Sequence, residues 1–264
     1  MDIQINTLNK LVRDMLPISL ADMKSIRLMK RTDKKYLTDV ATLCQLLQLA
    51  RDSYYVQEID GTRICSYATT YWDDEGHHAF RMHQAGHRPR RKVRVRSYLD
   101  SDLSFLEIKT KDNHDRTTKK RISVPSVQAV IDHHYGEDFL QERIGLTFDD
   151  ISPTVNNRFK RITLVNHGKT ERLTIDFDVH FRNLQSQNEA EMPNLAIIEL
   201  KRDGRLPSPI LPMLRELRIK PMGFSKYCIG AAITTPGLRI NRFKKRLIKI
   251  HKVTDKSSFH HPLT

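Results

Sequence analysis

Polar and apolar side chains alternate without a break through the stretch Arg172-Leu173-Thr174-Ile175-Asp176-Phe177-Asp178-Val179-His180-Phe181. Successive side chains on a β-strand point to opposite faces of the sheet, so this stretch predicts a strand with two unlike faces. One face carries Arg172, Thr174, Asp176, Asp178 and His180, and the other carries only apolar residues. A strand of this kind is half buried, which is typical of an antiparallel sheet.

Other segments repeat the alternation. Basic residues alternate with valine in residues 92–96, and residues 106–111 place Glu107, Lys109 and Lys111 on one face. Further strand candidates are residues 63–72, 158–165 and 195–202. Apolar residues recur at helical spacing in residues 8–15, 39–51 (with Thr38 as the predicted N-cap), 125–135, 210–218 and 239–252. We therefore expect an α+β fold in which helices are added to an antiparallel sheet.

The composition limits the class of protein. The 264 residues suit one large domain or two small ones, and 45 Lys and Arg against 31 Asp and Glu give a net charge of +14. Three widely spaced cysteines indicate a reducing compartment, and no apolar run approaches the ~18 residues of a membrane span. The amino terminus lacks the profile of a signal peptide. We predict a cytoplasmic protein with a polyanionic partner, which could be phosphate, nucleic acid or an acidic membrane.

The charged strand faces allow two interpretations. The polar side of a half-buried sheet explains any single strand. The set as a whole mixes carboxylates with bases and is rich in Arg, whose planar fork suits phosphate oxygens. If these strands curl into a barrel, they line its lumen with bases, and a triphosphate or polyphosphate is the natural occupant. The interleaved carboxylates would then hold Mg²⁺ or Mn²⁺. Alternation alone does not establish closure of the barrel.

A series of short motifs occurs in a fixed order along the chain. It comprises Arg31-Thr32-Asp33-Lys34-Lys35-Tyr36, Lys92-Val93-Arg94-Val95-Arg96-Ser97-Tyr98, Phe105-Leu106-Glu107-Ile108-Lys109, Thr118-Lys119-Lys120-Arg121-Ile122, Arg158-Phe159-Lys160-Arg161, Thr174-Ile175-Asp176-Phe177-Asp178, Ile198-Glu199-Leu200-Lys201 and Ser225-Lys226-Tyr227. From about residue 20 to about residue 235 the chain thereby resembles the VTC domain. That domain is the polyphosphate polymerase module of the vacuolar transporter chaperone complex and its bacterial relatives.

The resemblance implies an antiparallel eight-stranded tunnel of the CYTH-like triphosphate tunnel superfamily, with a charged lumen and helices packed outside. The implied single domain covers residues 1–264, with an N-terminal helical segment at 1–24 and a basic C-terminal helix and tail at 236–264. The implied catalytic bases are Lys35, Arg94, Arg96, Lys109 and Arg161. The implied phosphate-binding bases are Arg31, Arg81, Lys119 or Lys120, Arg158, Arg172, Lys201 and Lys226. Glu199 is implied as a ligand of Mn²⁺ or Mg²⁺, and Glu107 either shares that role or pairs with a lumen base.

The resemblance further implies an ATP-dependent polyphosphate polymerase, which transfers the γ-phosphoryl group of ATP to phosphate, pyrophosphate or a polyphosphate end. Hydrolases of the superfamily carry an acid where this chain has Arg31, and this departure favours the polymerase. The alternatives are an inorganic or nucleoside triphosphatase and a non-catalytic module that binds polyphosphate or nucleic acid. We expect no nucleic acid as partner, because the bases alternate with carboxylates and no RNP-like aromatic motif occurs. A membrane-protein partner stays an open question.

Two segments carry further alternatives. His83 and His87 have the i, i+4 spacing of a metal site, but the nearby Gly76, Gly86 and Pro89 favour a phosphate-facing or solvated loop. The basic amphipathic residues 239–252 fit a membrane-surface helix or a helix that packs on the barrel, and base rates favour the packed helix.

Overall fold

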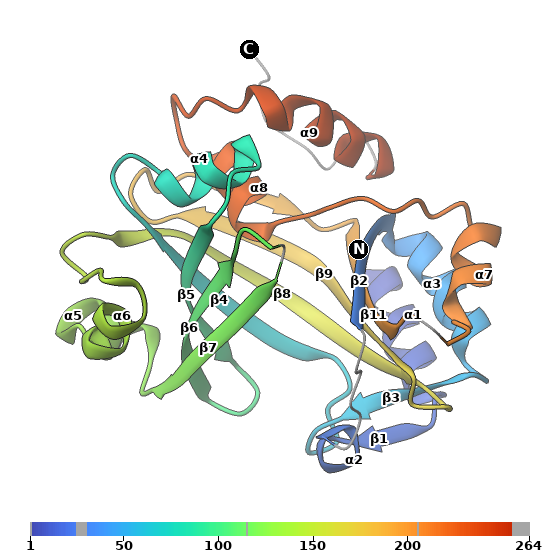
Figure 1. Ribbon diagram of the computed structural model, residues 1–264. Helices are drawn as coiled ribbons and strands as arrows, with labels where there is room; N and C mark the ends of the chain where they lie inside the picture. The colour runs from blue at the N-terminus through green and yellow to red at the C-terminus, as the bar shows by residue number, and fades with distance from the viewer. Residues whose placement is uncertain (1, 25–30, 115, 205, 255–264) are drawn as a thin grey trace.

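Eight strands form the main path of one antiparallel sheet (Figure 1). The computed structural model describes residues 2–24, 31–114, 116–204 and 206–254, without the side chains of residues 2–4, 24 and 31. In spatial order the strands are β2 (Arg31–Asp39), β11 (Leu195–Asp203), β9 (Glu171–Asn183), β8 (Ser152–Asn166), β4 (Cys65–Asp73), β5 (Arg90–Tyr98), β6 (Leu103–Lys111) and β7 (Thr117–Val124). The short strands β1 (Pro17–Ser19), β3 (Tyr54–Glu58) and β10 (Glu189–Met192) extend the sheet at its margins.

The sheet curls, but its two ends are not joined. The end strands of the path are β2 and β7, and no ladder pairs them within the described residues. Lys35 on β2 nevertheless lies near enough to Lys109 on β6 to lower the pKa of that lysine. The α+β class and the eight-stranded antiparallel order are therefore confirmed, whereas closure by backbone hydrogen bonds is not present in the part of the chain described here.

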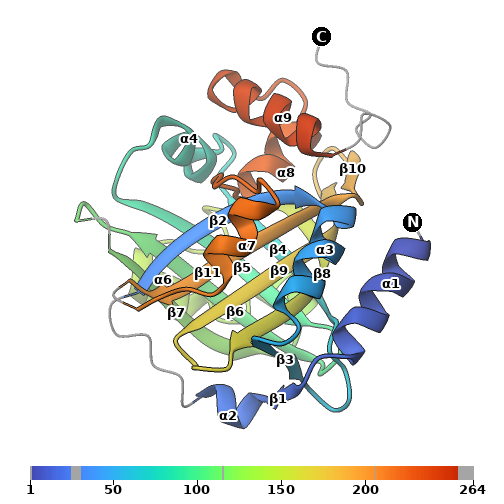
Figure 2. The same ribbon diagram turned by 90° about the vertical axis from the view of Figure 1, so that its right-hand side faces the viewer.

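Helices cover the outer face of the curled sheet (Figures 1 and 2). The helices α1 (Asp2–Arg13), α3 (Val40–Ala50) and α7 (Ile210–Glu216) pack against the apolar face of β8, β9 and β11, where Leu173, Ile175 and Phe177 are buried. The helices α5 (Val127–His133) and α6 (Glu137–Ile144) cover β5 and β6 around Val95 and Leu106. The short α2 (Leu20–Lys24) follows β1. In these parts of the sheet the apolar residues lie outside the curl, and the charged faces point inward.

Two local predictions were wrong. Asp39, not Thr38, caps α3, because its carboxylate accepts hydrogen bonds from the backbone and hydroxyl of Thr42. The His-rich segment is a helix, α4 (His78–Ala85), although its flanking glycines and proline favoured a loop. Asp73 accepts hydrogen bonds from the first amides of α4, and the buried Phe80 anchors the helix. An acid outside the segment therefore supplies the missing cap.

A β-bulge in β9 overturns part of the predicted alternation. Asp178 has a φ of 52°, and the register with β8 shifts at this point. The extra residue reverses the order of the faces, so Val179 and Phe181 turn to the inner face and His180 turns outward. The inner face of the curl consequently changes along β9 from charged to apolar.

The helix α8 (Lys226–Thr234) fills the apolar part of the inner face. All of its residues after Lys226 are buried, and they pack with Val155, Phe159 and Phe181. The helix α9 (Asn241–Val253) lies over α8 and α4 (Figure 1). Among the described residues, none of the helices is both long enough and apolar enough to span a membrane. One end of the curl is therefore occupied by a packed helix, and the charged wall occupies the rest.

The close approach of α8 to the wall makes Gly230 a test of this packing. A Cβ at this position would lie 2.6 Å from Phe181 Cδ1 and 2.9 Å from Val155 Cγ1. Alanine normally stabilises a helix by about 0.5–1 kcal/mol relative to glycine. We expect Gly230→Ala instead to lower the free energy of unfolding by about 1–3 kcal/mol in urea denaturation, because Phe181 and Val155 leave no room for the added methyl group. The control is Gly223→Ala, where a Cβ meets open space. Equal stability of the two variants would refute the packing.

Candidate functional site

The inner face gathers basic side chains from most strands of the path. Register places Lys92, Lys109 and Lys119 in one row across β5, β6 and β7, and Arg94, Glu107 and Arg121 in the next. Across β2, β11 and β9 the rows are Lys35, Glu199 and Thr174, then Asp33, Lys201 and Arg172. Arg161 on β8 faces Asp176 on β9, and Lys226 enters from the first turn of α8. Bases outnumber acids on this wall.

Glu107 is the most enclosed of the wall carboxylates. Its side chain is 0% exposed, and Arg94 donates to Oε2 from Nε at 2.8 Å and from Nη2 at 2.6 Å. Lys119 Nζ donates to Oε1 at 3.0 Å. Burial alone raises the pKa of a carboxyl group, but the charges of Arg94 and Arg96 overcome it and hold the pKa of Glu107 at about 2. Glu107 is therefore bound on both oxygens by Arg94 and Lys119. This arrangement favours the predicted pairing with lumen bases over the predicted role as a metal ligand.

Asp176 on β9 pairs with two bases on the other side of the lumen from Glu107, namely Arg161 on β8 and Lys226 on α8. Arg161 forms a two-pronged ion pair with it, with Nε at 2.5 Å and Nη2 at 2.9 Å, and Lys226 binds the same carboxylate. Burial raises the pKa of Asp176, yet the two bases lower it far below its ordinary value. Arg161 also lies over the ring of Tyr67, 4.9 Å from its centroid, and Lys226 lies 4.1 Å from that of Phe159. Ion pairs and aromatic faces thus fix both bases in place.

Glu199 keeps more contact with solvent than the other two acids. Its side chain is 25% exposed, and it pairs with Lys201 and, at 3.7 Å, with Lys35. Burial raises the pKa of Glu199, but Lys35 and Lys201 lower it well below the ordinary range. Lys35 Nζ also donates to the carbonyl of Phe224 at 2.9 Å. Of Glu107, Asp176 and Glu199, it is Glu199 that the structure leaves most accessible to a ligand in the lumen.

Arg96 and Lys109 have no carboxylate partner among the described residues. The Nε atom of Arg96 is buried without a hydrogen-bond partner, and burial together with Arg94 lowers its pKa to about 10. Burial and the charge of Lys35 lower the pKa of Lys109 to about 8. Burial would raise the pKa of Tyr71, yet the charges of Arg94 and Arg96 bring it down to about 8. The wall therefore has a strong positive potential that its own acids do not neutralise.

The structure brings together most of the predicted site residues on the inner wall: Lys35, Arg94, Arg96, Glu107, Lys109, Lys119, Arg161, Arg172, Glu199, Lys201 and Lys226. It also separates the two candidate lysines of β7. Lys119 binds Glu107, whereas Lys120 lies opposite the outward-facing Ile108 and is exposed.

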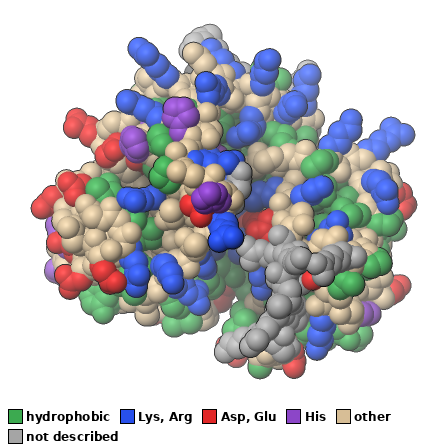
Figure 3. Space-filling model, in the orientation of Figure 1, with side chains coloured by type: hydrophobic (Ala, Val, Ile, Leu, Met, Phe, Trp, Pro, Cys, Tyr) green, Lys and Arg blue, Asp and Glu red, His purple; other side chains and the backbone are tan. Residues whose placement is uncertain are grey.

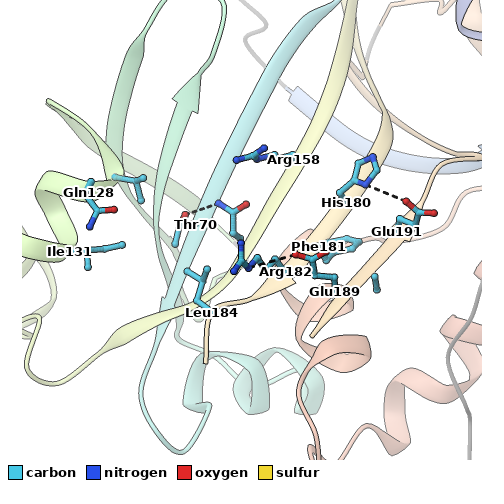
Figure 4. Close-up of a pocket in the computed structure, with 13 residues that line it drawn as sticks. Thr70, Gln128, Ile131, Arg158, His180, Phe181, Arg182, Leu184, Glu189 and Glu191 are labelled. Carbon is cyan, nitrogen blue, oxygen red and sulfur yellow. Dashed lines mark hydrogen bonds and ion pairs between the residues drawn. The ribbon is translucent and has the colours of Figure 1, made fainter. Parts of the chain in front are cut away.

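Three other predicted bases fall outside this group. Arg158 is on the opposite face of β8 from Arg161, because Arg158 pairs with Ala68 and Arg161 with Cys65 across β4. It lines a separate cavity of about 600 Å³ with Thr70 and His180 (Figure 4). Arg81 is exposed on α4. Arg158, Arg81 and Lys120 thus lie away from the inner wall, and of the two alternatives Lys119 and Lys120 it is Lys119 that faces the lumen. Arg31 begins β2, but its side chain lies outside the described part of the structure.

Several residues of the wall were not predicted as site residues, among them Lys92, Arg121, Asp176 and Tyr71. Lys92 donates to Ser225 Oγ at 2.8 Å, and the Arg121 guanidinium lies 4.2 Å from the centroid of the Phe105 ring. A signal for Lys92 and Arg121 was available, since each alternates in phase with a predicted base on the same strand, Arg94 or Lys119.

The wall has no ready-made cage for a metal ion. Within the described residues, no group of three or more His, Cys, Asp or Glu side chains is placed to hold one. Glu199 can supply carboxylate oxygens from one side of the lumen, and the remaining ligands would have to come from phosphate oxygens or water. The residues present thus fit a metal ion that enters with a phosphate ligand better than one held by protein alone.

Comparisons with known proteins agree with this geometry. The model of the VTC domain family matches residues 30–235. HpAC1 from Hippeastrum, described as a putative adenylyl cyclase with a dominant triphosphatase activity, has a similar structure with a TM-score of 0.52 and 14% identity. The match covers 79% of this chain and 98% of that one. A comparison with curated proteins finds no match.

Two further solved structures are more distant. The PH1012 protein from Pyrococcus horikoshii OT3 has a TM-score of 0.38 and 11% identity, over 72% of this chain and 91% of that one. The Pct1 RNA triphosphatase from S. pombe has a TM-score of 0.29 and 10% identity, over 82% of each chain. The family model covers most of the chain, and the eight-stranded sheet with its inward bases is the architecture expected for that family. The chain belongs to the VTC domain family and has the triphosphate tunnel fold.

Proposed function

We propose that this protein is an ATP-dependent polyphosphate polymerase. An oxygen of a phosphate or polyphosphate acceptor attacks the γ-phosphorus of ATP, the bond to the β-phosphate oxygen breaks, and ADP leaves. The observation that carries the proposal is the surplus of bases on the inner wall, above all Arg96 and Lys109, which have no carboxylate partner among the described residues. A wall of this charge binds a polyanion and spreads the charge that develops during phosphoryl transfer.

The state of the acids favours an anionic acceptor over water. Attack by water needs a group that accepts a proton, and such a group works best when its pKa lies near the working pH. Glu107, Asp176 and Glu199 each bind two bases, and the pKa of each lies far below neutrality. A phosphate acceptor is already ionised and chiefly needs positive charge to offset repulsion. The same wall therefore supports transfer between phosphates better than hydrolysis.

A divalent cation has a defined place in this proposal. Bound Mg²⁺ or Mn²⁺ would bridge phosphate oxygens and neutralise part of their charge. Glu199 is the carboxylate proposed to hold it, because its side chain keeps contact with the lumen while Glu107 is enclosed. Lys35 and Lys201 would then exchange part of their contact with Glu199 for contact with the phosphates.

The test of the function is a product balance. The protein is incubated with ATP and Mn²⁺, and ADP, orthophosphate and polyphosphate are measured in the same samples. We expect polyphosphate to account for most of the phosphoryl groups lost from ATP, and excess chelator to stop the reaction. Orthophosphate as the main product would establish the triphosphatase instead. If the protein binds polyphosphate tightly but releases no ADP, it is a non-catalytic binding module.

Arg96 is the best probe of the wall because its removal leaves no carboxylate without a partner. Replacing Arg94 would instead strand the buried Glu107. We expect Arg96→Ala to weaken the binding of tripolyphosphate by about 1.5–3 kcal/mol, the range for a hydrogen bond to a charged group. Lys120→Ala, on the outer face of β7, should bind as the wild type does. Calorimetric titration gives both affinities, and equal affinities for the two variants would disprove the assignment of the wall.

The lowered lysine pKa values predict a pH dependence of binding. Burial lowers the pKa of both Lys109 and Lys226 to about 8, so each loses its positive charge as the pH rises through about 8. Tripolyphosphate affinity should therefore fall from about pH 7 to about pH 9, by up to about tenfold per lysine for each pH unit above 8. Lys109→Arg should flatten the fall, since a guanidinium keeps its proton. An affinity that stays constant over this range would contradict the lysine roles.

A further inference from the structure

Two segments of the chain contain no acidic residue. Residues 76–99 and 217–254 together hold 17 of the 45 Lys and Arg residues and none of the 31 Asp and Glu residues. The remainder of the chain therefore has 28 Lys and Arg against 31 Asp and Glu. The positive excess of the protein comes entirely from these two segments, so where they lie decides where the excess charge acts.

The two segments meet at the end of the curl that α8 fills. Gln84 Nε2 in α4 donates to the carbonyl of Arg239 at 2.9 Å, and Arg242 Nη1 at the start of α9 donates to the carbonyl of Ala85 at 2.9 Å. Lys92 on β5 binds Ser225 at the N-cap of α8. Lys and Arg side chains gather over the upper part of the molecule, where α4 and α9 lie (Figures 1 and 3). Lys92, Arg94, Arg96 and Lys226 of these segments belong to the inner wall. The other bases on and around α4 and α9 form one basic surface, which we call the α4–α9 surface.

The helix α9 turns its apolar side into the protein and its bases outward. Phe243, Leu247 and Ile250 are buried against the α8 and α4 side. Its exposed bases are Arg242, Lys244, Lys245, Lys249 and Lys252. Within the described part of the chain, none of these five forms an ion pair with a carboxylate. Like charges this close repel one another, so the surface favours an anionic partner.

The α4–α9 surface is continuous with the inner wall through the surroundings of His83. The ring of His83 stacks on Phe243 of α9, at 6.3 Å between centroids. Burial is the largest cause that lowers the pKa of His83 to about 2, and the charges of Lys92, Arg90 and Arg246 add to it. Lys92 belongs to the wall and Arg246 to α9, so bases of both groups surround this one side chain.

The geometry favours a phosphate polymer over the two other polyanions. Because the apolar residues of α9 are buried, the helix lacks a free apolar face for insertion into a membrane; Ile248, at 45% exposed, is the exception. Phe243 is buried as well, so α9 offers no exposed Phe, Tyr or Trp ring on which a nucleic-acid base could stack. A polymer that is recognised by charge alone matches both this surface and the adjoining wall.

We propose that the α4–α9 surface binds phosphate polymer outside the tunnel and holds the growing chain, so that it sets the length of the product. This inference rests on the proposed polymerase function. It concerns a part of the chain beyond the family match, which ends at residue 235, whereas α9 begins at Asn241.

The test neutralises one stripe of α9. Lys245, Lys249 and Lys252 are exposed and lie on one side of the helix at i, i+4 and i+7. The triple variant Lys245→Gln/Lys249→Gln/Lys252→Gln is compared with a matched control, Lys10→Gln/Lys120→Gln/Lys169→Gln, which removes three exposed bases elsewhere. For each protein we measure the affinity for long-chain polyphosphate and for tripolyphosphate over a range of salt concentrations, initial ADP release, product length, and binding to vesicles that contain anionic lipid.

We expect the α9 variant to bind long-chain polyphosphate at least about tenfold more weakly at ~0.1 M salt, with a salt slope smaller by about 2 for the three lost charges. Tripolyphosphate affinity and initial ADP release should stay unchanged, and the products should be shorter. Unchanged long-chain affinity, or an equal loss in the control, would overturn the proposal. Loss of vesicle binding with intact polyphosphate binding would overturn it in favour of a membrane. Wild-type protein that releases only orthophosphate would contradict the polymerase, whereas a specific loss of long-chain binding would still support the surface.

Discussion

The inward pairing of acids with bases is the interaction on which the rest of this structure depends. A sheet that curls with its charged face inside must satisfy those charges within the protein, because unpaired buried charges are costly. Glu107 on one side and Asp176 on the other each bind two bases and so tie neighbouring strands together across the wall. The bases that exceed these acids are the ones proposed to bind a polyanion, so the fold and the proposed binding depend on one set of side chains.

The bulge at Asp178 limits how far the charged wall extends. Before it, β9 turns Asp176 inward; after it, β9 turns Val179 and Phe181 inward, and the inner face accepts the apolar α8. Lys226 stands at the first turn of α8, so the helix that fills one end also delivers a base to the site. One inserted residue in a strand therefore sets both the packing of α8 and the boundary of the charged lumen.

Alternation in the sequence predicted six of the eight strands of the path, because a period of two leaves each side chain only one of two faces. The strands β2 and β7 were not predicted in this way, and most wall residues followed from the resemblance to the VTC domain. Alternation could not predict the reversal after Asp178, since a bulge depends on the partner strand β8. The cap that Asp73 provides for α4 was also missed, because it comes from outside the helical segment. Arg158 was misplaced for a related reason: its motif was matched by similarity, whereas register with Ala68 decides its face.

The inner wall and the α4–α9 surface differ in how firmly their bases are held, because the wall contains acids that pair with its bases and α9 contains no acid. Inside the curl, Glu107 and Asp176 bind bases from neighbouring strands, so Arg94, Lys119 and Arg161 are held in a defined arrangement. On α9 the bases have no such partners in the described structure, and their flexible stems can follow a ligand of varying length. In the proposed polymerase, the paired bases of the wall would suit the transfer of one phosphoryl group, and the flexible row of lysines on α9 would suit a polymer whose length changes at each turnover.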